Sequence, residues 1–219
     1  MDKRKKIAIT LNFIIFALAV IGSIMTFFDI RFIDVKVWEH GIKELKFFTV
    51  QSNIFAGIIS LVFAIYLILE HKTNKPVPKP VHILKFMVTV DLVITFLVVA
   101  LLLGFFVEDG YYTVFVNSNL FFHLIIPILN FISFAFFEDV PNFSIKYTFF
   151  GIIHLTAYSI FYLIVVLTHY NDGGIDIYYD WYAFAQLGLP MAFVFAFIIL
   201  SLGYLVSYIT YKINKIRFK

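Results

Sequence analysis

Six long apolar stretches make up most of the 219 residues of this chain. A helix needs about 20 mostly apolar residues to cross the hydrocarbon core of a bilayer, and each stretch is about that long or longer. Backbone that faces lipid must satisfy its hydrogen bonds internally, which favours helices. We therefore predict an all-α, polytopic membrane protein, with one transmembrane domain over residues 1–219. The six predicted helices are 7–28, 47–69, 83–107, 119–137, 148–168 and 184–209.

The low content of charged residues supports this interpretation. Only 14% of the residues are charged and 62% are hydrophobic, whereas a soluble domain carries about a quarter charged residues. The chain has no cysteine, which excludes disulfides, thiolate metal sites and a cysteine nucleophile. The net charge of +3 is too small to indicate a nucleic acid partner.

The distribution of lysine and arginine predicts the orientation. With the N-terminus in the cytoplasm, segments 1–6, 70–85, 138–147 and 210–219 are cytoplasmic and hold 13 of the 17 basic residues. Cytoplasmic loops carry an excess of basic residues, so both termini are expected in the cytoplasm. The first apolar stretch follows basic residues, as in a signal peptide, but is longer than the usual core of about 7–15 residues, so we expect a retained helix.

The second predicted helix carries a stripe of small and polar residues. Thr49, Asn53, Gly57 and Ser60 follow one another at spacings of four, four and three, which places them on one helical face. Such a face usually lets two membrane helices pack closely. The alternative is that Thr49, at the outer end of the stripe, carries a nucleophilic hydroxyl.

The fourth predicted helix carries His123, Pro127 and Asn130 on one face. A histidine can move protons at neutral pH because its pKa is about 6.5. It can equally be a structural residue bonded to a neighbouring helix. The predicted topology places Thr49 and His123 near the outer membrane surface, at depths that differ by about 3 Å. A hydroxyl and an imidazole at one level are the minimum for a base-activated nucleophile.

A second polar group lies deeper in the predicted bundle. His154, Tyr158 and Tyr162 form a stripe at spacings of four on the fifth helix, which could line a substrate cavity, line a proton path or pack as aromatic residues. Asp91 is the only acid expected well inside a helix, where a carboxylate is protonated or paired. His154 lies at a similar depth and is its expected partner. The pair is either a structural lock or part of a proton-coupled transporter.

The segment between the last two helices is rich in acidic and aromatic residues. The aspartates of segment 170–182 do not follow the EF-hand pattern, so we expect no metal site there. An aromatic lid on the membrane surface explains the segment better. The chain contains no P-loop, dinucleotide fingerprint, zinc signature or G-x-S-x-G elbow, and we expect no cofactor.

Phe47-Phe48-Thr49 and His123-Leu124-Ile125-Ile126-Pro127 resemble the androgen-induced-gene family of small polytopic membrane proteins, including its bacterial six-helix relatives. The stretch Gln51-Ser52-Asn53 is closest to the bacterial members. Segment 177–184 resembles an aromatic element of the family, although the proline of that element is missing here.

The resemblance implies an activity. Eukaryotic members are threonine hydrolases that cleave fatty acid esters of hydroxy fatty acids, so Thr49 would be the nucleophile and His123 the base. A tetrahedral intermediate also needs hydrogen-bond donors for its oxyanion. Supporting polar residues would be Gln51, Ser52, Asn53, Asn119 and Asn130, with Asn119 orienting the imidazole of His123.

Two functional hypotheses follow. The first is an intramembrane lipid ester hydrolase that acts near the outer face, in the plasma membrane of a bacterium, with membrane lipids as solvent and substrate. The second is a non-enzymatic transporter or lipid-binding protein with a polar cavity around Asp91, His154, Tyr158 and Tyr162. Oligomeric state is not indicated by the sequence.

Overall fold

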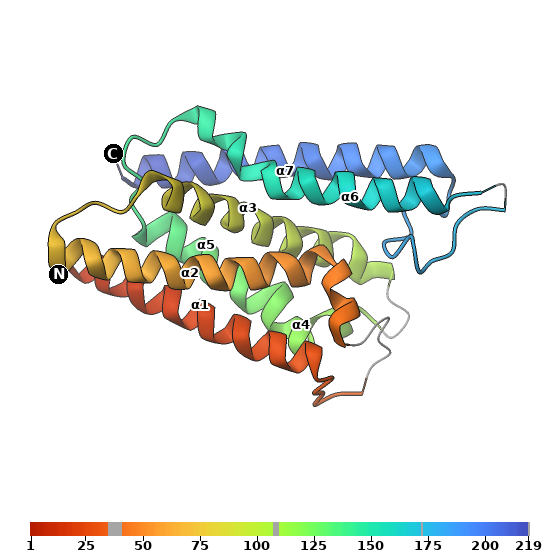
Figure 1. Cartoon of the computed structure of the whole chain (residues 1–219), viewed down its shortest axis with the longest axis horizontal. Helices are drawn as coiled ribbons and strands as arrows, with labels where there is room; N and C mark the ends of the chain where they lie inside the picture. Colours follow the sequence, from red (N-terminus) through yellow and green to blue (C-terminus); the bar gives the residue numbers. More distant parts are fainter. Residues whose placement is uncertain (35–40, 107–109, 172, 219) are drawn as a thin grey trace.

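In the computed structural model the long helices run side by side and form a bundle (Figure 1). The structure describes residues 1–34, 41–106, 110–171 and 173–218. Six helical segments in this part of the chain are long and apolar enough to cross a membrane, which confirms the predicted fold class. The long helices are α1 (Lys3–Phe27), α2 (Phe48–Thr73), α3 (Lys79–Leu101), α5 (Ile126–Phe137), α6 (Ile153–His169) and α7 (Leu189–Arg217).

Short turns complete the spans and connect them. α4 (Ser118–Leu120) and a π turn, η4 (Phe121–Ile125), precede α5 within the fourth span. The remaining turns are 3₁₀ helices: η1 (Gly41–Lys46), η2 (Leu103–Phe106), η3 (Tyr111–Phe115), η5 (Ile145–Thr148) and η6 (Phe150–Ile152). Both chain termini lie at one end of the bundle, here named the terminal end (Figure 1).

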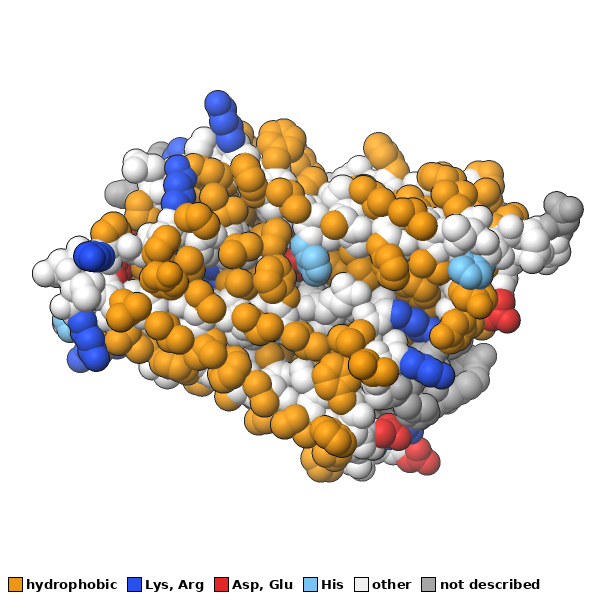
Figure 2. All heavy atoms as spheres, viewed as in Figure 1, with side chains coloured by type: hydrophobic (Ala, Val, Ile, Leu, Met, Phe, Trp, Pro, Cys, Tyr) orange, Lys and Arg blue, Asp and Glu red, His pale blue; other side chains and the backbone are white. Residues whose placement is uncertain are grey.

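The outer surface of the bundle is apolar along its length. Hydrophobic side chains cover most of the face drawn in Figure 2, while the lysine and arginine side chains stand near its two ends. Large side chains such as Phe197 on α7 are mostly exposed. A surface of this kind is suited to lipid rather than to water. The chain is therefore a multi-pass membrane protein.

Helix α3 is the centre of the bundle. It packs against α2, α5, α6 and α7, and 61% of its most apolar stretch is buried. α1 and α2 lie on one side of it, and α6 and α7 lie on the other (Figure 1). Polar side chains carried by α3 therefore face other helices rather than lipid.

Gly57, on the small-residue face of α2, packs closely against α1, whereas Asn53 and Ser60 on the same face bond the π turn and α3. Asn53, Gly57 and Ser60 are buried. A Cβ atom added at Gly57 would lie 2.6 Å from the Cβ of Ala19 on α1, so only glycine permits this approach.

Several helix boundaries differ from the prediction: α2 ends at Thr73 rather than at residue 69, α3 ends at Leu101 rather than at 107, and α7 ends at Arg217 rather than at 209. α3 begins at Lys79 rather than at residue 83, because Pro80 occupies the first turn, where proline is well tolerated. The pattern of basic residues assigns Lys85, at the start of the predicted helix 83–107, to the cytoplasmic side, but Lys85 lies inside the bundle and is fully buried. Glu138, counted with the next loop, is 2% exposed, so Asp91 is not the only acid in the interior.

The last helix begins later than predicted. α7 starts at Leu189 instead of residue 184, after Gly188 at a φ of 105°. Residues with this φ are strained unless they are glycine. The stretch 184–188 therefore belongs to the segment that connects α6 to α7.

Replacing Gly57 by leucine should separate α1 from α2. We expect overpacking to destabilise the fold by about 1–3 kcal/mol, whereas Ile58→Leu, at a neighbouring residue that is 51% exposed, should have little effect. Thermal unfolding of both variants in one detergent measures the difference. Equal melting temperatures would show that the α1–α2 contact does not depend on glycine.

Candidate functional site

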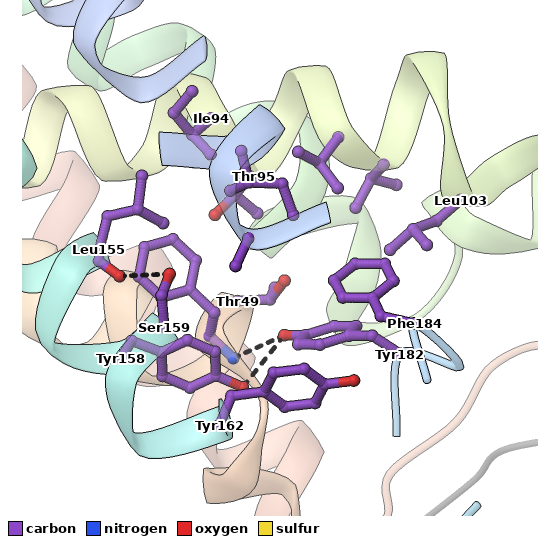
Figure 3. Close-up of a pocket in the computed structure, with 15 residues that line it drawn as sticks. Thr49, Ile94, Thr95, Leu103, Leu155, Tyr158, Ser159, Tyr162, Tyr182 and Phe184 are labelled. Carbon is purple, nitrogen blue, oxygen red and sulfur yellow. Dashed lines mark hydrogen bonds between the residues drawn. The ribbon is translucent and has the colours of Figure 1, made fainter. Parts of the chain in front are cut away.

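A cavity lies between α2, α3, α6, α7 and the segment that connects α6 to α7 (Figure 3). Its volume is about 610 Å³, including the part that opens toward the surface. The wall is mainly apolar, which is typical of sites that hold hydrophobic ligands. The lining residues are Phe48, Thr49, Ile94, Thr95, Val98, Val99, Leu103, Leu155, Tyr158, Ser159, Tyr162, Tyr182, Phe184, Ala196 and Ile199.

Thr49 is one of the few hydroxyl groups on this wall. It is the second residue of α2, after Phe47, whose extended backbone precedes the helix. The side chain of Thr49 points into the cavity (Figure 3). A hydroxyl in apolar surroundings gains reactivity only when a base removes its proton.

Tyr158 and Tyr182 line the cavity at the end away from the chain termini, and Trp181 contacts Tyr158 there. The Tyr158 hydroxyl donates to the carbonyl of Lys46 at 2.6 Å and accepts from the indole of Trp181 at 3.0 Å. The Tyr182 oxygen accepts from the backbone N–H of Phe48 at 3.0 Å and lies 3.3 Å from the Tyr158 oxygen (Figure 3). Burial raises the pKa of the Tyr182 hydroxyl, which therefore stays protonated at neutral pH.

Asp180 fixes the connecting segment above the cavity. Its carboxylate is fully buried and accepts hydrogen bonds from the backbone N–H groups of Phe184, at 3.0 Å, and Ala185, at 2.9 Å. Gln186 and the Tyr162 hydroxyl donate to the same carboxylate. The predicted aromatic lid is thus a folded cover that supplies Tyr182 and Phe184 to the cavity wall.

His123 lies in the π turn of the fourth span and is half-buried. Its Nδ1 donates to the carbonyl of Val114 at 2.6 Å. The carbonyl can only accept, so Nδ1 carries the proton and Nε2 carries the lone pair in the neutral ring. Single π turns occur often at functional sites, and this tautomer is the one that a general base at Nε2 requires.

The amide of Asn53 joins the two helices that carry Thr49 and His123. Its Nδ2 donates to the carbonyl of Thr49 at 2.8 Å and to the carbonyl of Phe122 at 3.0 Å. The start of α2 therefore lies beside the π turn. No hydrogen bond joins the Thr49 hydroxyl to His123, and His123 is not part of the cavity wall.

The supporting residues predicted around this pair have structural partners. Gln51 donates to the carbonyl of Leu45 at 2.7 Å, and Ser52 bonds the carbonyl of Thr49. With Asn53 they stabilise the start of α2, and none of the three lines the cavity. Asn119 makes no hydrogen bond to His123; the carbonyl of Val114 orients the ring instead.

The expected pair of Asp91 and His154 is present. Nδ1 of His154 lies 2.8 Å from Oδ2 of Asp91, which is fully buried. The imidazole stacks on Phe48 at 5.3 Å between ring centroids. Tyr158 and Tyr162 line the cavity, but Asp91 and His154 do not; the ring of Phe48 stands between the pair and the cavity.

Sequence reasoning missed a buried ion pair near the terminal end. The Nζ of Lys85 lies 3.8 Å from Oε1 of Glu138, and both side chains are fully buried. Lys85 also donates to Asn130 and to Ser60. Asn130 therefore supports this ion pair rather than a site around Thr49.

Other contributors to the cavity were also missed. Thr95 and Ser159 carry single hydroxyls at positions that gave no pattern in the sequence, and Tyr182 lies in a segment without helical periodicity.

Comparison of the chain with models of protein families, with curated proteins and with solved structures found no match.

Replacing Asp180 by asparagine should loosen the cover of the cavity. The amide keeps the shape of the carboxylate but cannot accept at both oxygens, so the N–H of Phe184 or Ala185 loses its partner. We expect faster hydrogen exchange at these two amides than in the unmodified protein. Asp176→Asn, four residues earlier in the same segment, serves as the control: its carboxylate accepts from the backbone N–H of Tyr178, so both amides should stay protected. Unchanged exchange in Asp180→Asn would contradict this role.

Proposed function

We propose that this chain is an intramembrane enzyme that hydrolyses a lipid ester, with Thr49 as nucleophile and His123 as general base. The observation that carries the proposal is the position of the Thr49 hydroxyl on the wall of an apolar cavity. The resemblance of the segments around these two residues to a family of threonine hydrolases points to the same chemistry.

The shape of the cavity supports a ligand with an alkyl chain. Its wall follows α3 from Ile94 to Val99, a distance of about 7.5 Å at the helical rise per residue, and continues to Leu103 in η2. Apolar side chains form most of this length, so a chain of methylene groups would be buried favourably. A ligand seated in this way could bring its ester group to Thr49.

His123 has the tautomer that the reaction needs. In the proposed reaction, the Thr49 oxygen attacks the ester carbonyl carbon while its proton moves to Nε2 of His123. The imidazolium then returns this proton to the leaving alcohol, and water releases the acyl group from Thr49. Because Thr49 and His123 share no hydrogen bond in the described structure, the proposal requires them to approach when substrate binds. Catalytic hydrogen bonds often tighten only at that stage.

Tyr182 is the best placed donor for the oxyanion. The donors of Gln51, Ser52 and Asn53 are bonded elsewhere, whereas the Tyr182 hydroxyl lies on the cavity wall beside Tyr158. It is protonated at neutral pH, since burial raises its pKa. A neutral hydroxyl directed at a developing negative charge stabilises it.

The test is fatty acid release from long-chain lipid esters by the purified protein in detergent. Thr49→Val keeps the shape of the side chain without its hydroxyl and should abolish release, whereas Thr49→Ser should retain it. His123→Ala should lower the rate by about 10²–10⁴-fold, the usual contribution of a general base. His154→Ala is the matched control, because this imidazole lies behind Phe48, and should remain active.

Two outcomes would contradict the assignment. Release by Thr49→Val at the rate of the unmodified protein would exclude Thr49 as nucleophile. A greater loss in His154→Ala than in His123→Ala would make His154 the base. Lipid that copurifies with a folded but inactive protein would favour the second candidate, a lipid-binding protein that uses the same cavity without cleavage.

A further inference from the structure

Helix α3 carries three titratable side chains into the interior of the bundle. His82 is 6% exposed, and Lys85 and Asp91 are fully buried. At the helical rise per residue, Lys85 lies about 4.5 Å from His82 along the helix axis, and Asp91 lies about 9 Å beyond Lys85. With their partners Glu138 and His154, these residues form a group that we name the polar row.

The first level of the polar row is the ion pair of Lys85 and Glu138. Oε1 of Glu138 accepts from Asn12 on α1 at 2.6 Å and from Ser133 on α5 at 2.5 Å. Lys85 donates to Ser60 on α2 at 2.9 Å and to Asn130 on α5. Four helices therefore supply polar groups at one depth. Ionisable groups inside a membrane are costly and are usually tied to function.

The second level is the pair of Asp91 and His154. Thr89, between the two levels on α3, accepts from Asn130 at 2.8 Å. Beyond Asp91, the hydroxyl of Thr95 bonds Ser52 on α2 at 3.3 Å and lies on the cavity wall. The polar row thus extends from the first turn of α3 near the terminal end to the cavity near the other end.

Several buried polar atoms without a hydrogen-bond partner belong to residues of the polar row or to residues next to it. Among the described residues there are five: Oδ1 of Asn12, Oδ1 of Asn53, Nδ1 of His82, Oδ1 of Asp91 and Oε2 of Glu138. Three belong to the polar row, Asn12 contacts Glu138, and Asn53 is adjacent to Ser52. Buried polar atoms are almost always hydrogen-bonded, and internal water is their usual partner where the protein supplies none.

We propose that the polar row conducts protons between the two ends of the bundle, through internal water bound at these unpartnered atoms. Each transfer breaks one O–H or N–H bond and forms another, and the row returns to its starting charge after a proton has passed. The two levels share no hydrogen bond, so water at Glu138 and Asp91 completes the connection. This activity does not depend on ester hydrolysis.

The charged groups that face the polar row are consistent with this role. Glu70 and Asp139 act electrostatically on His82, Glu138 acts on Lys85, and His154 acts on Asp91. Acidic groups therefore stand where a proton would enter near the terminal end. Each level also pairs an acid with a base, which keeps its net charge low in a region where uncompensated charge is costly.

Proton flux into liposomes tests the proposal. The purified protein is reconstituted, a potassium gradient with valinomycin sets the membrane potential, and a pH-sensitive dye in the lumen reports proton entry. We expect faster acidification than in protein-free liposomes. Glu138→Gln and Asp91→Asn should each reduce the flux to the protein-free rate, while Asp29→Asn, an exposed site paired with Arg31, should not change it.

A second variant separates conduction from folding. Lys85→Met combined with Glu138→Leu replaces the ion pair by apolar side chains, a change that proteins often tolerate well. We expect this double variant to melt no lower than the unmodified protein and to lose the flux. The proposal is overturned if the unmodified protein conducts no faster than protein-free liposomes. It is equally overturned if folded Glu138→Gln and Asp91→Asn conduct normally.

Discussion

Lipid offers no hydrogen bonds, and this constraint governs the interior of the bundle. A polar group that a helix carries below the membrane surface needs a hydrogen-bond partner inside the bundle, on its own helix or on another. α3 carries the largest number of such groups because it lies at the centre, in contact with α2, α5, α6 and α7. The ion pair of Lys85 and Glu138, with its partners on α1, α2 and α5, ties these four helices together.

The same helix also separates two environments. Toward the terminal end, its polar side chains meet α2 and α5, whereas from Ile94 to Val99 it forms part of the apolar wall of the cavity. Thr95 and Phe48 stand at the boundary: Thr95 connects the polar side chains to the cavity, and Phe48 separates His154 from it. A reactive hydroxyl at Thr49 would therefore work in apolar surroundings, apart from the pair of Asp91 and His154 and the ion pair of Lys85 and Glu138.

The fold follows from periodicity and hydropathy, since both are local properties of the chain. The six spans, a small-residue packing face on α2 and the pair of Asp91 and His154 were all predicted from spacing and depth. Lys85 and Glu138 were not, because a charge near a span boundary is usually placed in water. Only the packing of four helices shows that both are enclosed.

The candidate site was harder to predict, because its parts meet only in three dimensions. The π turn at His123 changes which groups its ring can reach, and helical spacing alone led to Asn119 instead of the carbonyl of Val114. Tyr182 lies in a segment with no regular period, so its place on the cavity wall depends on the hydrogen bonds of Asp180. The pairing of Thr49 with His123 stays a prediction.

The central claim is that a lipid occupies the cavity next to Thr49. Because the chain has no cysteine, a single Thr49→Cys substitution can be labelled with an uncharged maleimide in detergent. Ser52→Cys, a fully buried position that is not on the cavity wall, is the matched control. We predict that Thr49→Cys reacts and that a long-chain lipid ester slows its labelling, while Ser52→Cys does not react. Labelling of Thr49→Cys at the same rate with and without the ester would contradict the account.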